Sequence, residues 1–206
     1  MGVSIDDGYI KYTSTRRDGR VPSSAALDEL NQARTVLFDL GLIGVYGNGV
    51  GYGNLSMRFN GNNQFVITAS ATGALRTLQT EQFCLVESFS IPNNHVQSMG
   101  SLPASSESLT HGAIYAAHMG VQCVIHVHSR TLFDHLLQTG VAATPVDAQY
   151  GTPAMADAVA QLVGRHPLMP TVFAMAGHDE GVVAFGADIP STRNALCQLF
   201  QRTLTP

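Results

Sequence analysis

Val124-Ile125-His126-Val127-His128-Ser129 is an apolar stretch, typical of a buried strand, that carries two histidines two positions apart. Successive side chains of a strand point to opposite faces of a sheet, so His126 and His128 share one face. Imidazole nitrogen is a usual zinc ligand, and two histidines on one face can reach a single ion. The alternative is a polar pair on a half-exposed strand that binds no metal.

A zinc site that keeps a position open for substrate usually has three protein ligands. His178, in the turn Ala176-Gly177-His178-Asp179-Glu180-Gly181 between two apolar segments, is the best-placed third ligand. Cys123 lies an odd number of residues from His126, so we expect it to face the core instead. Asp179 and Glu180 are candidates to orient a ligand histidine. Four other histidines stand in polar or helix-end contexts, where a solvated side chain is the simpler interpretation: His95, His118, His135 and His166.

Ser105-Ser106-Glu107 stands at the start of a helix that we predict over residues 105–118. A carboxylate in the first turn is stabilised by the helix dipole, which is a structural role for Glu107. Beside a cation, Glu107 would instead serve as a general base. His111 follows one turn later on the same helix face and is expected to hydrogen bond Glu107. Ser105 and Ser106 are candidates to cap the helix or to bind an anion at its N-terminus.

Helical and strand-like segments alternate through the rest of the chain. Apolar residues from Leu27 to Leu40 recur at spacings of three and four, with Ser23 or Ser24 as N-cap and Gly41 as the stop. The other predicted strands are 55–59, 64–68, 83–87, 122–127, 171–176 and 182–185, and the other predicted helices are 132–138, 155–163 and 190–204. Six glycines between Gly41 and Gly53 form a loop suited to close approach of a ligand. This order predicts one α/β domain over residues 23–206, preceded by an N-terminal arm of residues 1–22.

Composition excludes several classes of function. The 206 residues include 11 basic and 15 acidic side chains, for a net charge of −4, so we expect neither a nucleic-acid partner nor an anionic membrane partner. No apolar run approaches the ~18–20 residues of a membrane span, and the polar N-terminus lacks the centre of a signal peptide. We therefore expect a cytoplasmic protein whose three cysteines are free thiols.

The order and spacing of these motifs resemble the class II aldolase/adducin family. The resemblance runs from near Ser24 to near Leu204. The motifs that carry it are Gly53-Asn54-Leu55-Ser56 with Arg58, Thr68 to Gly73, Ser105-Ser106-Glu107 with His111, residues 125–129, and His178 with Gly181 and Gly186. It implies a single-domain, three-layer αβα fold with a central, mainly antiparallel sheet.

The resemblance also implies roles for individual residues. Zn²⁺, or another divalent metal, would be bound by His126, His128 and His178, and Glu107 would be the catalytic residue. The substrate phosphate would be bound by Gly53, Asn54, Thr72, Gly73, Ser105 and Ser106. These residue types are suited to bind a phosphate. Backbone N–H groups at glycine, side-chain hydroxyls and a helix N-terminus can together bind an anion without a basic side chain.

The implied activity is that of a zinc-dependent lyase, an aldolase. It would cleave a phosphorylated keto-sugar through a metal-stabilised enediolate to dihydroxyacetone phosphate and an aldehyde. A pentulose-phosphate 4-epimerase, a sugar-phosphate dehydratase or a decarboxylase would use the same site, so these activities stay open. A non-enzymatic, adducin-like scaffold is the third hypothesis, although all three histidines and Glu107 are present. Members of the family usually assemble as homotetramers.

Three features depart from the family pattern. Asp179 and Glu180 stand where glycine commonly follows the late histidine, and their charge is expected to affect which substrate fits. The family's aldolases use a tyrosine on a C-terminal tail as a proton donor, whereas this chain ends at Pro206 directly after its last helix. We therefore expect that donor to be absent or to come from elsewhere. The loop from Gly41 to Gly53 is also richer in glycine than expected.

Overall fold

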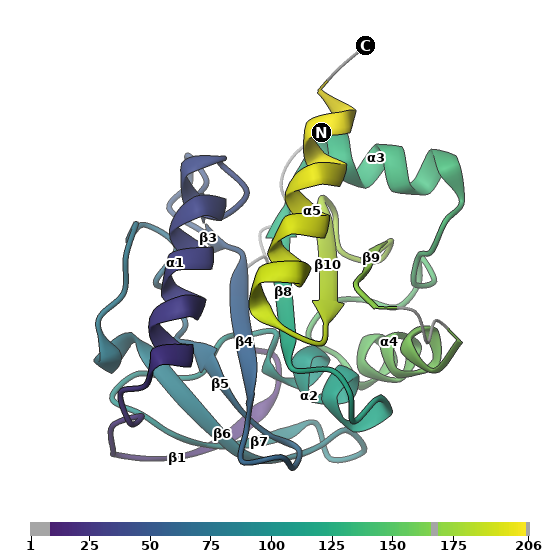
Figure 1. The fold of residues 1–206 in the computed structure, drawn as a ribbon. Helices are drawn as coiled ribbons and strands as arrows, with labels where there is room; N and C mark the ends of the chain where they lie inside the picture. Colours follow the sequence, from purple (N-terminus) through teal and green to yellow (C-terminus); the bar gives the residue numbers. More distant parts are fainter. Residues whose placement is uncertain (1–8, 166–168, 205–206) are drawn as a thin grey trace.

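Eight strands form one twisted sheet in the order β1-β7-β6-β5-β4-β8-β10-β9 in the computed structural model, which describes residues 9–165 and 169–204 (Figure 1). The strands are β1 (Thr13–Arg17), β2 (Gly44–Val45), β3 (Gly51–Tyr52), β4 (Asn54–Phe59), β5 (Gln64–Thr68), β6 (Phe83–Ser90), β7 (His95–Met99), β8 (Cys123–His128), β9 (Thr171–Ala174) and β10 (Gly181–Gly186). The helices are α1 (Ala25–Asp39), α2 (Ser108–Ala117), α3 (Arg130–Thr139), α4 (Pro153–Arg165) and α5 (Ile189–Thr203), with a 3₁₀ turn η1 (Thr80–Gln82). Only β1 and β7 pair in parallel within the eight-stranded sheet, so the sheet is mainly antiparallel, as predicted.

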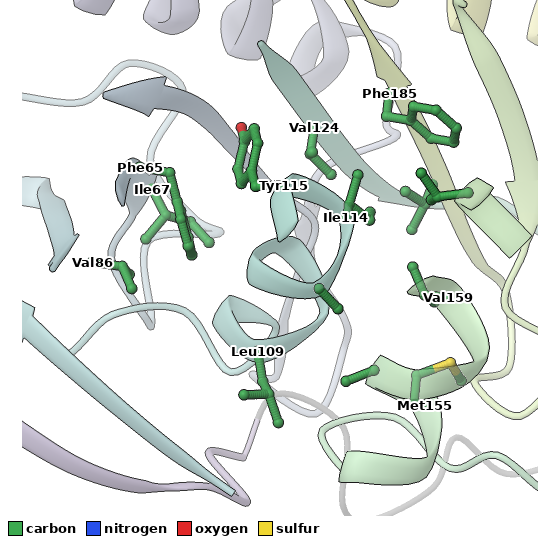
Figure 2. Close-up of a cluster of buried hydrophobic side chains, with 14 of the residues drawn as sticks. Phe65, Ile67, Val86, Leu109, Ile114, Tyr115, Val124, Met155, Val159 and Phe185 are labelled. Atoms are coloured by element: carbon green, nitrogen blue, oxygen red, sulfur yellow. The ribbon is translucent and has the colours of Figure 1, made fainter. Parts of the chain in front are cut away.

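The sheet separates two hydrophobic cores. Helices α1, α3 and α5 cover one face, where Leu30 and Leu132 join a cluster with Ile125 and Val127 of β8. Helices α2 and α4 cover the other face, where the Tyr115 ring of α2 lies 5.1 Å from the Phe65 ring of β5, and Figure 2 shows α2 between Phe65 and Met155 of α4. The alternation along β8 therefore sends Ile125 and Val127 to one core, and His126, His128 and Val124 to the opposite face. This arrangement confirms the predicted three-layer αβα architecture.

Local sequence explains the ends of the helices. The Ser24 hydroxyl accepts a hydrogen bond from the backbone N–H of Leu27 and caps α1, as predicted. Asp188 caps α5 in the same way, with Pro190 in the first turn. Helix α2 begins at Ser108 with Glu107 at its N-cap, three residues later than the predicted start. The Ser105-Ser106 segment therefore stays outside the helix and faces the cavity described below.

Four strands do not follow from the sequence pattern. Strand β1 lies within the segment predicted as an N-terminal arm, where its five exposed residues pair with β7. Strand β7 carries mostly polar side chains, so it lacks the alternation of apolar and polar residues that would predict a strand. Strands β2 and β3 lie in the glycine-rich loop and pair as a small hairpin. Within the residues described, none of the helices combines the length and the apolar character needed to traverse a membrane.

Candidate metal centre

Three histidines converge at one end of the central strands. His126 and His128 extend from β8, and His128 lies opposite Gly181 in the register between β8 and β10. The turn before β10 is closed by hydrogen bonds from His178 N–H to the Met175 carbonyl and from Gly181 N–H to the His178 carbonyl. The turn brings His178 to the pair, with ring centroids 5.1 Å from His126 and 4.7 Å from His128. One ring nitrogen from each histidine lies within 4.8 Å of the other two.

Glu107 lies beside this triad because the N-terminus of α2 meets the turn before β10. Its Oε2 accepts a hydrogen bond of 2.7 Å from the Thr110 hydroxyl, and its Oε1 lies 3.7 Å from Nδ1 of His178. The Glu107 side chain is 2% exposed. Among the described residues, Glu107 Oε1 and His126 Nε2 are buried without a hydrogen-bond partner. Buried polar atoms of this kind require a partner, and a divalent cation bound by imidazole nitrogens would provide one.

Burial and mutual repulsion keep the two strand histidines neutral. The pKa of His126 is lowered well below its ordinary value, mainly by burial and then by the neighbouring charges of His128 and His178. Burial is also the main cause that lowers the pKa of His128. Neutral imidazole is the form that binds a metal, so both groups are ready to do so near neutral pH. The residues present therefore fit the metal that the sequence predicts.

The prediction of a hydrogen bond between His111 and Glu107 is wrong. Nδ1 of His111 instead makes a hydrogen bond of 2.7 Å with the Ser56 hydroxyl, which also contacts the Tyr115 hydroxyl. His111 is fully buried between α2 and the sheet, and burial lowers its pKa to about 3. The helix face that carries His111 turns toward β4 rather than toward the metal centre, so His111 belongs to the core.

A cavity of about 380 Å³ opens in front of the histidines. All ten residues predicted for the site line it: Gly53, Asn54, Thr72, Gly73, Ser105, Ser106, Glu107, His126, His128 and His178. The amide of Asn54 is 3.3 Å from Nδ1 of His126, so Asn54 contacts a metal-site histidine as well as the cavity. The Thr72 hydroxyl donates to the Ala69 carbonyl, which fixes the loop between β5 and η1.

Glycine is required where two segments of this cavity meet. Gly53 has a φ of +80°, in the left-handed region that side chains disfavour. A Cβ atom on Gly73 would lie 2.2 Å from the Gly44 carbonyl oxygen. The hairpin of β2 and β3 therefore packs directly on the backbone of the 69–74 loop, and the two segments form one wall of the cavity.

Sequence reasoning missed Arg34, which anchors this wall. Arg34 is 1% exposed, and its guanidinium donates to the carbonyls of Thr72, Leu75 and Arg76. Burial lowers the pKa of Arg34 to about 10. A basic residue on the apolar face of α1 is a signal that would have identified this anchor, because a buried guanidinium needs acceptors.

Aromatic residues around the site were also missed. Three tyrosines line the cavity: Tyr9, Tyr52 and Tyr150. The Tyr150 ring stacks on the His178 ring at 4.4 Å between centroids, and the Lys11 ammonium lies 3.8 Å from the centroid of the Tyr150 ring. Nothing in the local sequence around these residues predicts that they reach the site, because they come from separate loops.

The acidic turn, formed by Asp179 and Glu180 after His178, makes ion pairs with an arginine. Arg130, at the start of α3, pairs with Asp179. It also pairs with Glu180, whose Oε1 lies 3.4 Å from the Nε of Arg130. The negative charge expected beside the metal centre is therefore partly balanced by Arg130. Cys123 lies in the core cluster behind the sheet, as predicted from its position.

The remaining histidines lie away from the triad. Nε2 of His95 is 3.0 Å from the Thr15 hydroxyl, and Nδ1 of His118 accepts a hydrogen bond from Gly120 N–H. His135 is half-buried on α3, and His166 lies outside the described residues.

Comparisons with known proteins agree with this architecture. The family model for the class II aldolase and adducin N-terminal domain matches residues 47–201. A search of curated proteins finds no match. Among solved structures, an L-fuculose-1-phosphate aldolase from Thermus thermophilus is 21% identical, with a TM-score of 0.61 over 86% of this chain and 90% of that chain. YgbL from Klebsiella pneumoniae, a putative aldolase, epimerase or decarboxylase, is 21% identical, with a TM-score of 0.65 over 86% of each chain.

A sugar-phosphate aldolase from Thermotoga maritima shows the same likeness, with 17% identity and a TM-score of 0.63 over 86% of this chain and 91% of that chain. At these identities the structural neighbours establish the fold alone. The family model spans most of the chain, from the glycine-rich hairpin to the last helix. The chain therefore belongs to the class II aldolase and adducin family.

Proposed function

We propose that this chain is a zinc-dependent aldolase that cleaves a phosphorylated keto-sugar to dihydroxyacetone phosphate and an aldehyde. The observation that carries the proposal is the convergence of His126, His128 and His178 with the buried carboxylate of Glu107 in one cavity. The family that the chain belongs to includes the class II aldolases, which are metal-dependent enzymes. A scaffold protein would have no need to bury three histidines around a carboxylate.

The three histidines would hold Zn²⁺, or another divalent metal, through their imidazole nitrogens. Bound there, the metal supplies a Lewis acid for the carbonyl oxygen of the substrate. His126 and His128 contribute from a rigid, central strand, which fixes the direction of both rings. His178 comes from a turn whose backbone is closed by hydrogen bonds on both sides.

Glu107 would transfer the proton. Its Oε2 is occupied by the Thr110 hydroxyl, so Oε1 is the oxygen left to take up a proton at the reacting carbon and to return it. The carboxylate is held at the N-cap position of α2.

The far wall of the cavity would bind the phosphate group. Gly53 and Gly73 line the cavity with backbone, because a Cβ atom there would collide with Ile43 and with the Gly44 carbonyl respectively, and Thr72 lies beside Gly73. Ser105 and Ser106 precede α2 and line the same cavity. Together they offer neutral hydrogen-bond donors beside a helix N-terminus, which is the chemistry of an anion site.

The test begins with metal content. Purified wild type is compared with His128→Ala by elemental analysis, with His135→Ala on α3, outside the histidine cluster, as the matched control. Release of dihydroxyacetone phosphate is then assayed over a panel of ketose 1-phosphates. Zinc near one per chain that is lost in His128→Ala but retained in His135→Ala, together with product release, supports the proposal.

Other outcomes change the assignment. Zinc without release redirects it to epimerase, dehydratase or decarboxylase chemistry, which would be assayed on pentulose phosphates and sugar acids. Absence of zinc in wild type, even after metal is added back, overturns the metalloenzyme. We also propose that the enzyme is a cytoplasmic homotetramer, which light scattering and cell fractionation would check.

A further inference from the structure

The hydroxyl of Tyr46 lies between two groups of the metal centre. It is 2.7 Å from Nδ1 of His128 and 3.0 Å from Oε2 of Glu180. Tyr46 comes from the glycine-rich hairpin and Glu180 from the acidic turn after His178. The sequence pattern named no side chain of the hairpin for the site and did not distinguish Glu180 from Asp179. The structure brings Tyr46 and Glu180 together at Nδ1 of His128, and Nε2 is the other nitrogen of that ring.

The hairpin holds Tyr46 in a fixed position. Tyr46 N–H donates to the Val50 carbonyl, and Gly49 N–H donates to the Tyr46 carbonyl, so the turn closes on Tyr46 itself. The Asn48 side chain accepts a further hydrogen bond from Val50 N–H within this turn. The Tyr46 ring also packs on the Tyr52 ring, with centroids 4.5 Å apart. The glycine-rich loop is thus a built hairpin that delivers one hydroxyl to His128.

Glu180 is held from its own side. Its φ of +62° lies in the left-handed region, which a residue with a side chain rarely adopts. The Glu180 carbonyl accepts a hydrogen bond from Ser129 N–H, and Oε1 faces Nε of Arg130. Oε2 is left to face Tyr46. Glycine would relieve the backbone at this position, so the presence of glutamate there indicates a use for the carboxylate.

The chemistry of the three groups fixes the direction of the hydrogen bonds. A carboxylate only accepts, so the Tyr46 hydroxyl donates to Glu180. The phenolic oxygen then accepts the Nδ1–H of His128, which leaves the lone pair on Nε2 for a metal ion. Hydrogen bonds of this kind to a ligand histidine fix its tautomer and ring orientation.

We propose that Tyr46 and Glu180 are positioning residues that act in series on His128, holding it with Nε2 free to bind the metal. This inference rests on the metal centre of the proposed function. It assigns a role to the hairpin and to the acidic turn together: each supplies one half of a carboxylate–hydroxyl–imidazole chain.

The test measures metal binding rather than turnover. Zinc affinity is determined by chelator competition for wild type, Tyr46→Phe and Glu180→Gln, and the visible spectrum of the Co²⁺ form reports the geometry around the metal. Each variant should bind zinc about 10–100-fold more weakly and change the Co²⁺ spectrum. Because the two residues act in series, the double variant should be no weaker than Tyr46→Phe alone.

Two control variants separate this role from general structural effects. Asp179→Asn removes the neighbouring carboxylate, which binds Arg130. Tyr115→Phe removes a buried hydroxyl that contacts Ser56 away from the cavity. Both should bind zinc as wild type does, and thermal unfolding of the metal-free proteins checks that every variant is folded.

The two proposals fail in different ways. A wild-type protein that binds no zinc overturns the metal centre and this inference together. Wild type that binds zinc, with Tyr46→Phe and Glu180→Gln as tight as the two controls, overturns only the inference. Losses that add in the double variant also overturn it, because they show that the two residues act independently.

Discussion

Oε1 of Glu107 lies 3.7 Å from Nδ1 of His178, although α2, β8, α3, α4 and β9 separate the two residues in the chain. The distance is longer than a hydrogen bond, and it leaves Oε1 directed at the cavity rather than bound to protein. The carboxylate and the imidazole therefore share one space in front of the central strands. Their separation is what allows different roles for the two groups.

Replacement of Glu107 by glutamine tests this separation of roles. The amide retains the size of the side chain and an oxygen for the Thr110 hydroxyl, but it cannot take up a proton. We expect turnover to fall about 10²–10⁴-fold. Zinc content should stay near that of wild type, because the three histidines remain. Elemental analysis and single-turnover kinetics on the same sample check both statements, and undiminished turnover would exclude Glu107 as the base.

The fold could be predicted largely because its signals are local. The alternation along β8 predicted which residues face the core, and the spacing from Leu27 to Leu40 predicted α1. Strand β1 carries five exposed residues, and its pairing depends on backbone hydrogen bonds to β7, which leave no trace in hydrophobic periodicity.

The residues of the candidate site also divide into those that local sequence predicts and those that it does not. His126 and His128 are two residues apart, and the turn around His178 is punctuated by glycine, so their positions are readable. Tyr46 meets His128 across 82 residues of chain. Contacts of that kind depend on tertiary packing, which a local pattern does not encode. Arg34 is the intermediate case, because a charge on an apolar helix face predicts buried acceptors without saying which ones.

Substitution of Gly73 by alanine tests the contact between the hairpin and the 69–74 loop. The new Cβ would lie 2.2 Å from the Gly44 carbonyl oxygen and 3.0 Å from the Gly51 Cα, so backbone must move. We expect the free energy of unfolding to fall by about 1–3 kcal/mol. The matched control is Gly47→Ala in the same hairpin, where nothing lies within 4 Å. Urea unfolding should leave this control within ~0.5 kcal/mol of wild type. Equal effects in the two variants would contradict the close approach.

Arg34→Met tests the anchor under the same wall. The variant keeps the length of the side chain but leaves three carbonyls without their donor. Each buried acceptor left unsatisfied costs about 1–3 kcal/mol, so the unfolding free energy should fall by at least ~2 kcal/mol. The KM for the phosphorylated substrate should rise, because Thr72 is one of the three acceptors.

Arg76→Met is the control for this experiment. Arg76 pairs with Asp39 on the surface, where solvent screens the interaction. Its unfolding midpoint in urea should therefore stay close to that of wild type, and its KM should be unchanged. A loss in Arg76→Met as large as that in Arg34→Met would show that the effect is not specific to the buried guanidinium.

His111 predicts the pH dependence of stability in the metal-free protein. Its pKa is about 3 in the folded state because of burial, and near 6.5 in the unfolded chain. The unfolded state therefore binds the proton first as pH falls. Stability is fully present above about pH 6.5 and is lost progressively toward pH 3, by up to about 1.4 kcal/mol per pH unit for this one group.

The variant His111→Asn isolates that contribution. Asparagine preserves a polar atom near Nδ1 for the Ser56 hydroxyl but does not titrate in this range. It should be less stable than wild type at pH 7.5, because packing around the ring is lost. Between pH 6.5 and 4.5 the unfolding free energy of the variant should fall less steeply with pH than that of wild type. The difference in slope should correspond to about one proton fewer taken up on unfolding. Urea unfolding in the presence of a chelator measures both slopes. His126 and His128 have lowered pKa values as well, so a residual slope remains in the variant. Parallel slopes for wild type and His111→Asn would show that His111 is not held neutral in the core.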